Sequence, residues 1–116
     1  MKYLAKYINN YDGDTIDVSI EIWPGITLVL DNARLIDIDT PEMNSSNPKE
    51  KELAQKAKDY LRKRLEHRYF FIEPIKKGKY GRWLIKVYLT EEYINQTLVD
   101  EGYAKTYDGG KRESWF

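Results

Sequence analysis

Carboxylates and arginines are concentrated in two short stretches of the chain. Asp14 lies in the first stretch. In the second, Arg34 precedes Asp39 and Glu42, and Arg82 adds another guanidinium from a later turn. Carboxylate oxygens suit a hard cation such as calcium, which also accepts backbone carbonyls and water. A cation and arginines together neutralise phosphoryl oxygens, while a carboxylate activates water. These residue types therefore indicate metal-assisted attack on a phosphodiester.

Other kinds of site have little support in the composition. The chain has no cysteine, which excludes a thiolate metal site, a thiol nucleophile and a disulfide. The only histidine, His67, follows a predicted helix and is interpreted as an ordinary surface residue. Transition-metal binding and histidine-based acid–base catalysis are therefore not expected.

Each acidic stretch also has a purely structural interpretation. Asp12 and Gly13 form the residue pair most typical of a hairpin turn. Asp39 and Glu42 flank Pro41 and fit a strand terminator with solvated acids. Taken alone, each stretch leaves this alternative open. The functional interpretation gains weight because the acids occur together with two arginines.

The composition predicts a single domain over residues 1–116, because this length allows a real core but no second domain. Lys+Arg and Asp+Glu both number 19, so nucleic-acid binding would need a local basic patch. Neither the N-terminus nor any other stretch has a long apolar run, which predicts no membrane segment. We expect a cytoplasmic protein, or a secreted one if a leader has been removed.

The elements that must position the site follow from periodicity and turn residues. Alternation predicts strands at Lys2–Ile8, Asp14–Ile20, Ile26–Ile38, Arg68–Lys76 and Trp83–Leu89, with a short strand within Tyr103–Tyr107. Helices are predicted from the Asn47 cap to Leu65 and from a Thr90 cap to Gly102. Three strands, a helix and two strands predict a mainly β, α+β fold: a five-stranded antiparallel OB-fold barrel with two helices. Residues 108–116 are expected to form a loosely ordered tail.

The strand that carries the second acidic stretch poses a geometric problem. Counting by twos, Arg34 shares the parity of the apolar residues Leu30, Ile36 and Ile38, whereas Asp39 has the opposite parity. One site cannot contain both side chains if the strand stays regular. The strand is therefore predicted to end, bulge or twist sharply between Asp37 and Thr40.

Three sequence motifs carry a family resemblance. They resemble, in order, the motifs of the staphylococcal nuclease (thermonuclease) family. The first is Asp12-Gly13-Asp14-Thr15, the second is Arg34-Leu35 with Ile38-Asp39-Thr40-Pro41-Glu42, and the third is Lys79-Tyr80-Gly81-Arg82. The stretch from Asn95 to Lys105 also resembles that family's helix and closing strand. The resemblance implies an OB-fold nuclease that hydrolyses DNA and RNA with calcium and leaves 3′-phosphate ends.

The resemblance assigns roles to the acidic residues. It implies that Asp14 and Asp39 bind calcium through their carboxylates and Thr40 through its backbone carbonyl. It also implies that Glu42 is the general base that activates water. The roles agree with what the residue types alone indicate.

The resemblance also assigns the residues that bind substrate. Arg34 and Arg82 would grip the scissile phosphate and stabilise its developing charge. Lys79 and Tyr80 would contact a neighbouring phosphate or sugar, and Tyr107 lies near the place of the family's base-stacking tyrosine. The planar fork of arginine suits this task because it binds phosphate bidentately, which lysine cannot do.

The expected partner is a DNA or RNA substrate, single-stranded or frayed, bound by a monomer. Basic residues gather between residues 76 and 86, where aromatic side chains able to stack on unpaired bases accompany them. The alternative is a non-catalytic nucleic-acid- or protein-binding module on the same barrel. The presence of all the acidic and arginine side chains of the motifs favours the enzyme.

Overall fold

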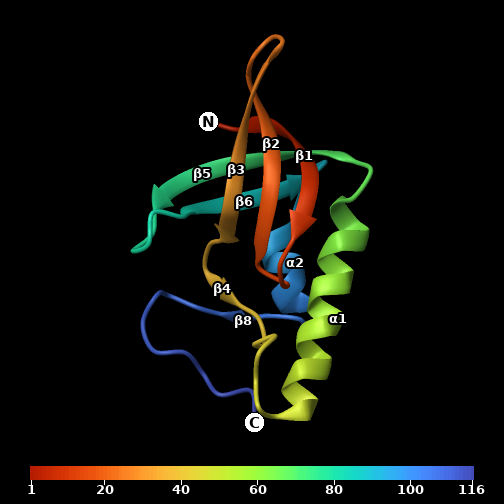
Figure 1. Ribbon diagram of the computed structural model, residues 1–116, viewed down its shortest axis with the longest axis vertical. Helices are drawn as coiled ribbons and strands as arrows, with labels where there is room; N and C mark the ends of the chain where they lie inside the picture. Colours follow the sequence, from red (N-terminus) through yellow and green to blue (C-terminus); the bar gives the residue numbers. More distant parts are fainter.

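Five strands form a closed barrel in the computed structural model, which describes residues 1–116 (Figure 1). These strands are β1 (Tyr3–Asn10), β2 (Thr15–Trp23), β3 (Ile26–Leu35), β5 (Tyr69–Lys77) and β6 (Trp83–Leu89). Their order is β3-β2-β1-β5-β6, and β3 pairs with β6 to close the barrel. The predicted five-stranded OB-fold barrel is confirmed, but the closing β3–β6 pair is parallel, so the barrel is mixed and not wholly antiparallel.

Three short strands and two helices complete the fold. They are β4 (Ile38–Asp39), α1 (Pro48–Leu65), β7 (Glu92–Tyr93), α2 (Ile94–Asp100) and β8 (Lys105–Thr106). β4 pairs with β8, which confirms the predicted short strand after the second helix. Buried apolar side chains from the barrel strands and both helices form one core. Neither helix combines the length and the apolar character that crossing a membrane requires.

Helix α1 begins where its sequence predicts. The side chain of Asn47 accepts a hydrogen bond from the Lys49 amide at 2.9 Å, and Pro48 occupies the first helical position. One face of the helix is buried against the rest of the protein, and its buried residues are Ala54, Ala57, Leu61 and Leu65. The helix runs along one side of the barrel (Figure 1). It also passes the loop of residues 40–47 between β4 and α1, here called the acidic loop.

The predicted cap of the second helix is wrong. Thr90 has a φ of 58° and belongs to the turn between β6 and β7, and α2 begins only at Ile94. Glu92 does not lie in a helical first turn; its carboxylate binds the guanidinium of Arg64 on α1. This hydrogen bond lowers the pKa of Glu92. A long-range ion pair therefore replaces the local capping that the sequence favoured.

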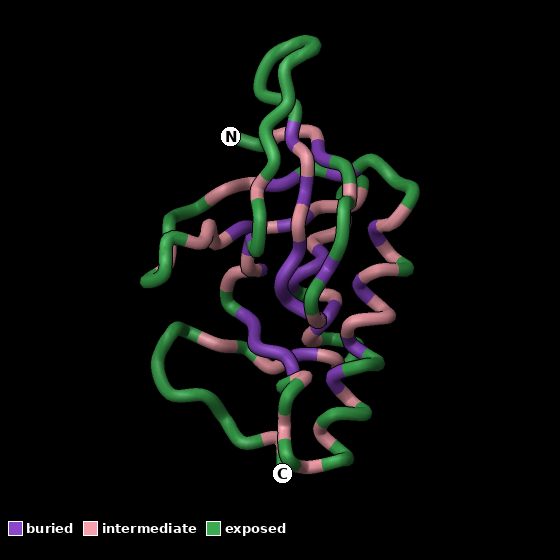
Figure 2. The backbone as a smooth tube through the Cα atoms, viewed as in Figure 1, coloured by how far each residue is buried: buried purple, intermediate pink, exposed green.

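The hairpin between β2 and β3 projects from the barrel (Figure 1). Its tip contains Trp23, Pro24 and Gly25, the break expected from the sequence, and Gly25 has a φ of 80° that suits glycine. The projecting part of the hairpin is exposed along its length (Figure 2).

A bulge in β3 reverses the predicted parity of Arg34. Asn32 has a φ of 54°, and the β2–β3 register shifts there because two residues of β3 face Asp17 alone. The Asn32 amide donates to the Asp17 carboxylate at 2.7 Å. After the bulge, Ala33 and Leu35 point into the core. The expectation that Arg34 points to the apolar face is therefore wrong, because the bulge turns it outward.

The chain leaves β3 sooner than expected. The strand ends at Leu35, and Asp37 adopts a φ of 68° before the chain resumes as β4. The Tyr107 amide donates to the Asp37 carbonyl at 2.8 Å, which fixes the new direction. The single strand predicted as far as Ile38 is thus wrong, whereas a sharp break before Thr40 is present.

Asn95 holds this break in place from α2. Its side chain is buried and donates to the carbonyls of Ile36 at 3.0 Å and Ile85 at 3.1 Å. Its amide oxygen accepts a hydrogen bond from Val87 at 3.0 Å. One side chain therefore joins the helix, β6 and the segment that leads to Asp39.

We expect Asn95→Ala to destabilise the protein by roughly 2–4 kcal/mol, because three buried backbone groups lose a partner. Urea unfolding would measure the change in the free energy of unfolding. Gln96→Ala, on the exposed face of the same helix, is the control and should change stability by less than about 0.5 kcal/mol. Equal effects of the two substitutions would contradict this account of the break.

Candidate functional site

The turn between β1 and β2 is held against helix α1. Asn10 is buried, and its side-chain amide donates at 2.9 Å to the carbonyls of both Asp12 and Lys58. Gly13 does not have the positive φ of a tight hairpin turn. A Cβ atom at Gly13 would instead lie 2.7 Å from Ala57 Cβ and 2.9 Å from Thr40 Cγ2. This glycine is therefore needed for close packing between the turn, the helix and the acidic loop.

Asp14 and Asp39 are buried and face the same arginine. Their side chains are 5% and 7% exposed, and Nη2 of Arg34 lies 3.5 Å from Asp14 Oδ2 and 3.3 Å from Asp39 Oδ1. Burial and the neighbouring Asp12 carboxylate raise the pKa of Asp14, and Arg34 opposes this. The break at Asp37 has therefore brought Asp39 to Arg34, as the predicted change of direction requires.

The loop after β4 joins the two acidic stretches. The amide of Thr40 donates to Asp14 Oδ2 at 3.2 Å. The amide of Glu42 donates at 2.9 Å to Glu50 of helix α1, and the same carboxylate accepts the hydroxyl of Ser45 at 3.0 Å. Glu50 thus holds the loop in place through both of its oxygens. The side chain of Glu42 is 54% exposed and free to reach solvent.

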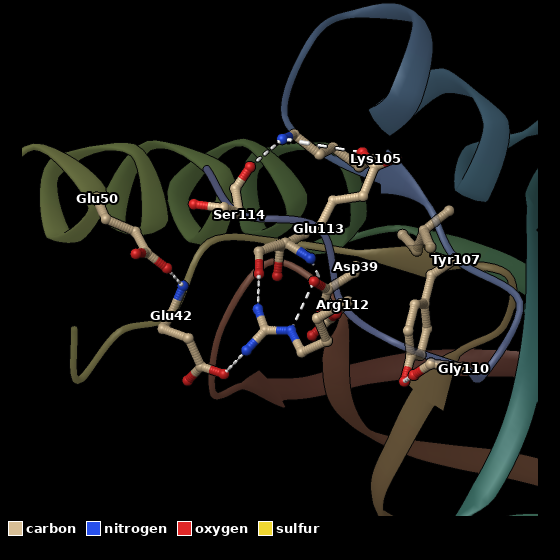
Figure 3. Close-up of polar contacts among 12 residues, drawn as sticks. Asp39, Glu42, Glu50, Lys105, Tyr107, Gly110, Arg112, Glu113 and Ser114 are labelled. Atoms are coloured by element: carbon tan, nitrogen blue, oxygen red, sulfur yellow. Dashed lines mark hydrogen bonds and ion pairs between the residues drawn. The ribbon is translucent and has the colours of Figure 1, made fainter. Parts of the chain in front are cut away.

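Arg112 from the C-terminal segment enters this acidic loop (Figure 3). Its Nε donates to Asp39 Oδ2 at 2.7 Å and its Nη2 to the Thr40 carbonyl at 3.2 Å. Its Nη1 donates to the carboxylate of Glu42. One cation of the chain itself therefore contacts three of the oxygen-bearing residues that the sequence singled out.

The closure of the barrel brings the two motif arginines to one surface. Arg34 pairs with Leu84 across the parallel β3–β6 contact, and Arg82 immediately precedes β6. Both arginines line a hollow of about 560 Å³ together with Lys79, Tyr80 and Tyr107. All five predicted substrate-binding side chains are therefore brought together, and the Arg34 guanidinium lies 5.6 Å from the ring centre of Tyr107.

A second hollow adjoins the first. It has a volume of about 400 Å³, and Arg34 and Arg82 line it together with Glu42. The two arginines thus lie on the border between the two hollows. One hollow is lined by Glu42, and the other is lined by lysine and tyrosine side chains. A phosphodiester bound by both guanidinium groups would have a carboxylate on one side and aromatic faces on the other.

The oxygen atoms present fit a hard cation. Asp39 Oδ2 and the Thr40 carbonyl converge on a single positive group, the Arg112 guanidinium, which stands in for a cation there. No three acidic or histidine side chains are gathered closely enough to hold a metal by themselves. A cation would therefore take the two buried carboxylates, the carbonyl and water molecules, as calcium commonly does.

Sequence reasoning missed two residues of this region. Asn95, which fixes the approach to Asp39, lies in a helix and contacts backbone groups that are distant in sequence. Arg112 lies in a polar segment that was expected to be a loosely ordered tail, and no local pattern sets it apart from Lys111 beside it. Neither residue could be found without the long-range contacts.

Comparisons with known proteins agree with the motifs. The family model for staphylococcal nuclease homologues matches residues 32–114. A thermonuclease of Staphylococcus hyicus is 31% identical over 106 residues, which cover 84% of this chain and 62% of that protein. A thermonuclease of Staphylococcus intermedius is 32% identical over 105 residues, covering 89% of this chain and 58% of the relative.

An uncharacterized protein of Bacillus anthracis is also similar, with 30% identity over 102 residues that cover 85% of this chain. The match covers 45% of that protein. The chain therefore spans about half to three-fifths of the length of these relatives.

We expect Gly13→Ala to disturb the site as well as the fold. The added methyl group would force the turn away from Ala57 and Thr40, which should cost about 1–3 kcal/mol of stability. It should also displace the loop that contains Thr40, and urea unfolding together with the NMR signal of the Thr40 amide would measure both effects. Lys56→Ala, on the exposed face of helix α1, is the control and should change stability by less than about 0.5 kcal/mol. An unchanged stability of Gly13→Ala would contradict the packing argument.

Proposed function

Because the chain belongs to the staphylococcal nuclease family, we propose that it is a calcium-dependent phosphodiesterase that hydrolyses DNA and RNA and leaves 3′-phosphate ends. The observation that carries the proposal is the position of Arg34 and Arg82 between two hollows, one containing Glu42 and the other Tyr80 and Tyr107. We also propose that the substrate is single-stranded or frayed, because stacking on tyrosine requires an unpaired base, and that the enzyme acts as a monomer.

In the proposed reaction, the two arginines bind the oxygens of the scissile phosphate. Their planar forks orient the phosphate and stabilise the negative charge that grows on it as water attacks. Lys79 and Tyr80 bind a neighbouring phosphate or sugar, and Tyr107 stacks against a base. Arg34 also remains close to Asp14 and Asp39, so it connects the phosphate with the acidic pair.

Glu42 is proposed as the general base. Its exposed carboxylate lines the hollow beside both arginines, where it would accept a proton from the attacking water. Asp14, Asp39 and the Thr40 carbonyl would hold the calcium ion, and a bound calcium ion would supply positive charge to the phosphoryl oxygen and lower the pKa of water. The leaving 5′-oxygen departs as the new bond to phosphorus forms, which leaves the phosphate on the 3′ side.

We expect single-stranded DNA to be cleaved by the protein with millimolar calcium and to stay intact with excess chelator. Arg82→Ala should slow cleavage about a hundredfold or more. Arg62→Ala, on the exposed surface of helix α1, is the matched control and should retain activity. With a substrate that has a dye at its 5′ end, a shift in the mobility of the labelled product after phosphatase treatment would identify the terminal 3′-phosphate. Binding of DNA without cleavage under any condition would instead support a non-catalytic module.

We expect Glu42→Gln to slow single-turnover cleavage at saturating calcium by about 10²- to 10⁴-fold, because the amide cannot accept the proton from water. Calcium affinity, measured by calorimetry, should not be lost, since this exposed carboxylate is proposed to act on water. Complete loss of calcium binding would show that Glu42 is a direct ligand and would overturn its assignment as the base.

A further inference from the structure

Arg112 and a calcium ion would require the same oxygen atoms. We propose that the segment Asp108–Phe116, here called the tail latch, inserts the Arg112 guanidinium into the calcium site as a built-in competitor that cation binding displaces. This inference rests on the proposed function, because it concerns the same site. It makes the cation affinity of the protein a property of its C-terminal segment as well as of its acidic residues.

The competition follows from the contacts. Arg112 Nε lies 2.7 Å from Asp39 Oδ2, and its Nη2 lies 3.2 Å from the Thr40 carbonyl oxygen. Calcium binds oxygen ligands at about 2.3–2.6 Å and surrounds itself with six to eight of them. A guanidinium and a calcium ion cannot both occupy this space, because their charges repel and their positions overlap. Binding of one therefore excludes the other.

The burial of Asp39 explains why one of the two must be present. Its carboxylate is 7% exposed, and Arg34 contacts only Oδ1. Oδ2 has Arg112 as its partner. A buried carboxylate oxygen without a donor or a cation carries a large desolvation cost. A cation that binds here would therefore replace one positive partner of Asp39 with another.

The docked arginine also contacts Glu42, the residue proposed as the general base. Nη1 of Arg112 donates to the carboxylate of Glu42 (Figure 3). A carboxylate oxygen that is held by a guanidinium is not free to contact a water molecule. The docked latch thus blocks two functions together: cation binding at Asp39 and proton acceptance at Glu42.

Few contacts hold the tail latch. Lys105 Nζ on β8 donates to the Ser114 carbonyl at 2.6 Å (Figure 3). The same Nζ lies 4.7 Å from the ring centre of Trp115. The Tyr107 hydroxyl donates to the Gly110 carbonyl at 2.8 Å. The latch contains no helix or strand and is mostly exposed (Figure 2). Apart from the partly buried Trp115, the latch is therefore held mainly by polar contacts, and displacement of the Arg112 guanidinium would weaken its hold.

The first test is a calorimetric calcium titration of the full chain. If Arg112 is docked for about nine-tenths of the time, Arg112→Ala should bind calcium about tenfold more tightly than the wild type. Lys111→Ala removes the same charge from the next residue, which lines a different hollow beside α2, and should bind calcium with wild-type affinity. Arg112→Lys keeps the charge but cannot contact three oxygens at once, so it should also bind more tightly than the wild type.

The second test follows the latch in the wild-type protein by nitrogen-15 NMR of arginine side chains. The Nε–H signal of Arg112, identified by its absence in Arg112→Lys, should be protected from exchange without calcium and lose this protection on calcium addition. Magnesium and sodium at the same ionic strength serve as controls for general screening of charge.

The outcomes separate this inference from the proposed function. Equal calcium affinity of wild type and Arg112→Ala, or an Arg112 signal that calcium leaves unchanged, would overturn the latch and leave the nuclease proposal standing. Tighter binding by Lys111→Ala equal to that of Arg112→Ala would reduce the effect to general charge and also overturn the latch. Absence of calcium binding in every variant would overturn the calcium site itself, and the latch with it.

Discussion

The structure depends on placing two like-charged carboxylates in a buried position beside one arginine. Asp14 and Asp39 come from segments 25 residues apart, and both face Nη2 of Arg34 at 3.5 and 3.3 Å. Buried carboxylates repel each other and resist ionisation unless positive charge lies close by. Burial and the neighbouring Asp12 carboxylate raise the pKa of Asp14, and the Arg34 guanidinium offsets this only in part. The pair is therefore suited to bind a further cation.

The barrel supplies this arrangement through its one parallel contact. The pairing of β3 with β6 sets Arg34 beside Leu84, two residues after Arg82, so both arginines reach the same surface. The bulge at Asn32 then turns the Arg34 side chain out of the core. Asp37 has a left-handed backbone conformation, and the turn it makes brings Asp39 back towards Arg34. Each departure from regular strand geometry thus has a consequence for the site. Asn95 stabilises the turn at Asp37 by hydrogen bonding to the carbonyls of Ile36 and Ile85, on both sides of the closure.

Local features were predictable from the sequence, and long-range ones were not. The Asn47 cap and the break at Gly25 follow from the preferences of neighbouring residues, and the structure contains both. The site motifs were visible because residue type alone indicates phosphate and cation chemistry.

The parity of Arg34 was predicted wrongly, since a bulge depends on how β2 pairs with β3. Thr90 failed as a cap because the chain first turns back to pair β7 with β6, so that α2 begins only at Ile94. Arg112 acts 73 residues away from Asp39, beyond any local pattern.

Burial also explains which contact of Arg112 matters most. Glu42 is 54% exposed and is solvated well without a partner, whereas Asp39 is 7% exposed and its Oδ2 is contacted by Arg112. The strength of the tail latch is therefore set mainly at Asp39, and the contact with Glu42 is a consequence of docking there. Coupling between two binding events is reciprocal. Any partner or substrate that draws the tail away must raise the affinity for the cation by the same factor by which the cation raises the affinity for that partner. The proposed cation site and the C-terminal segment thus form one linked equilibrium.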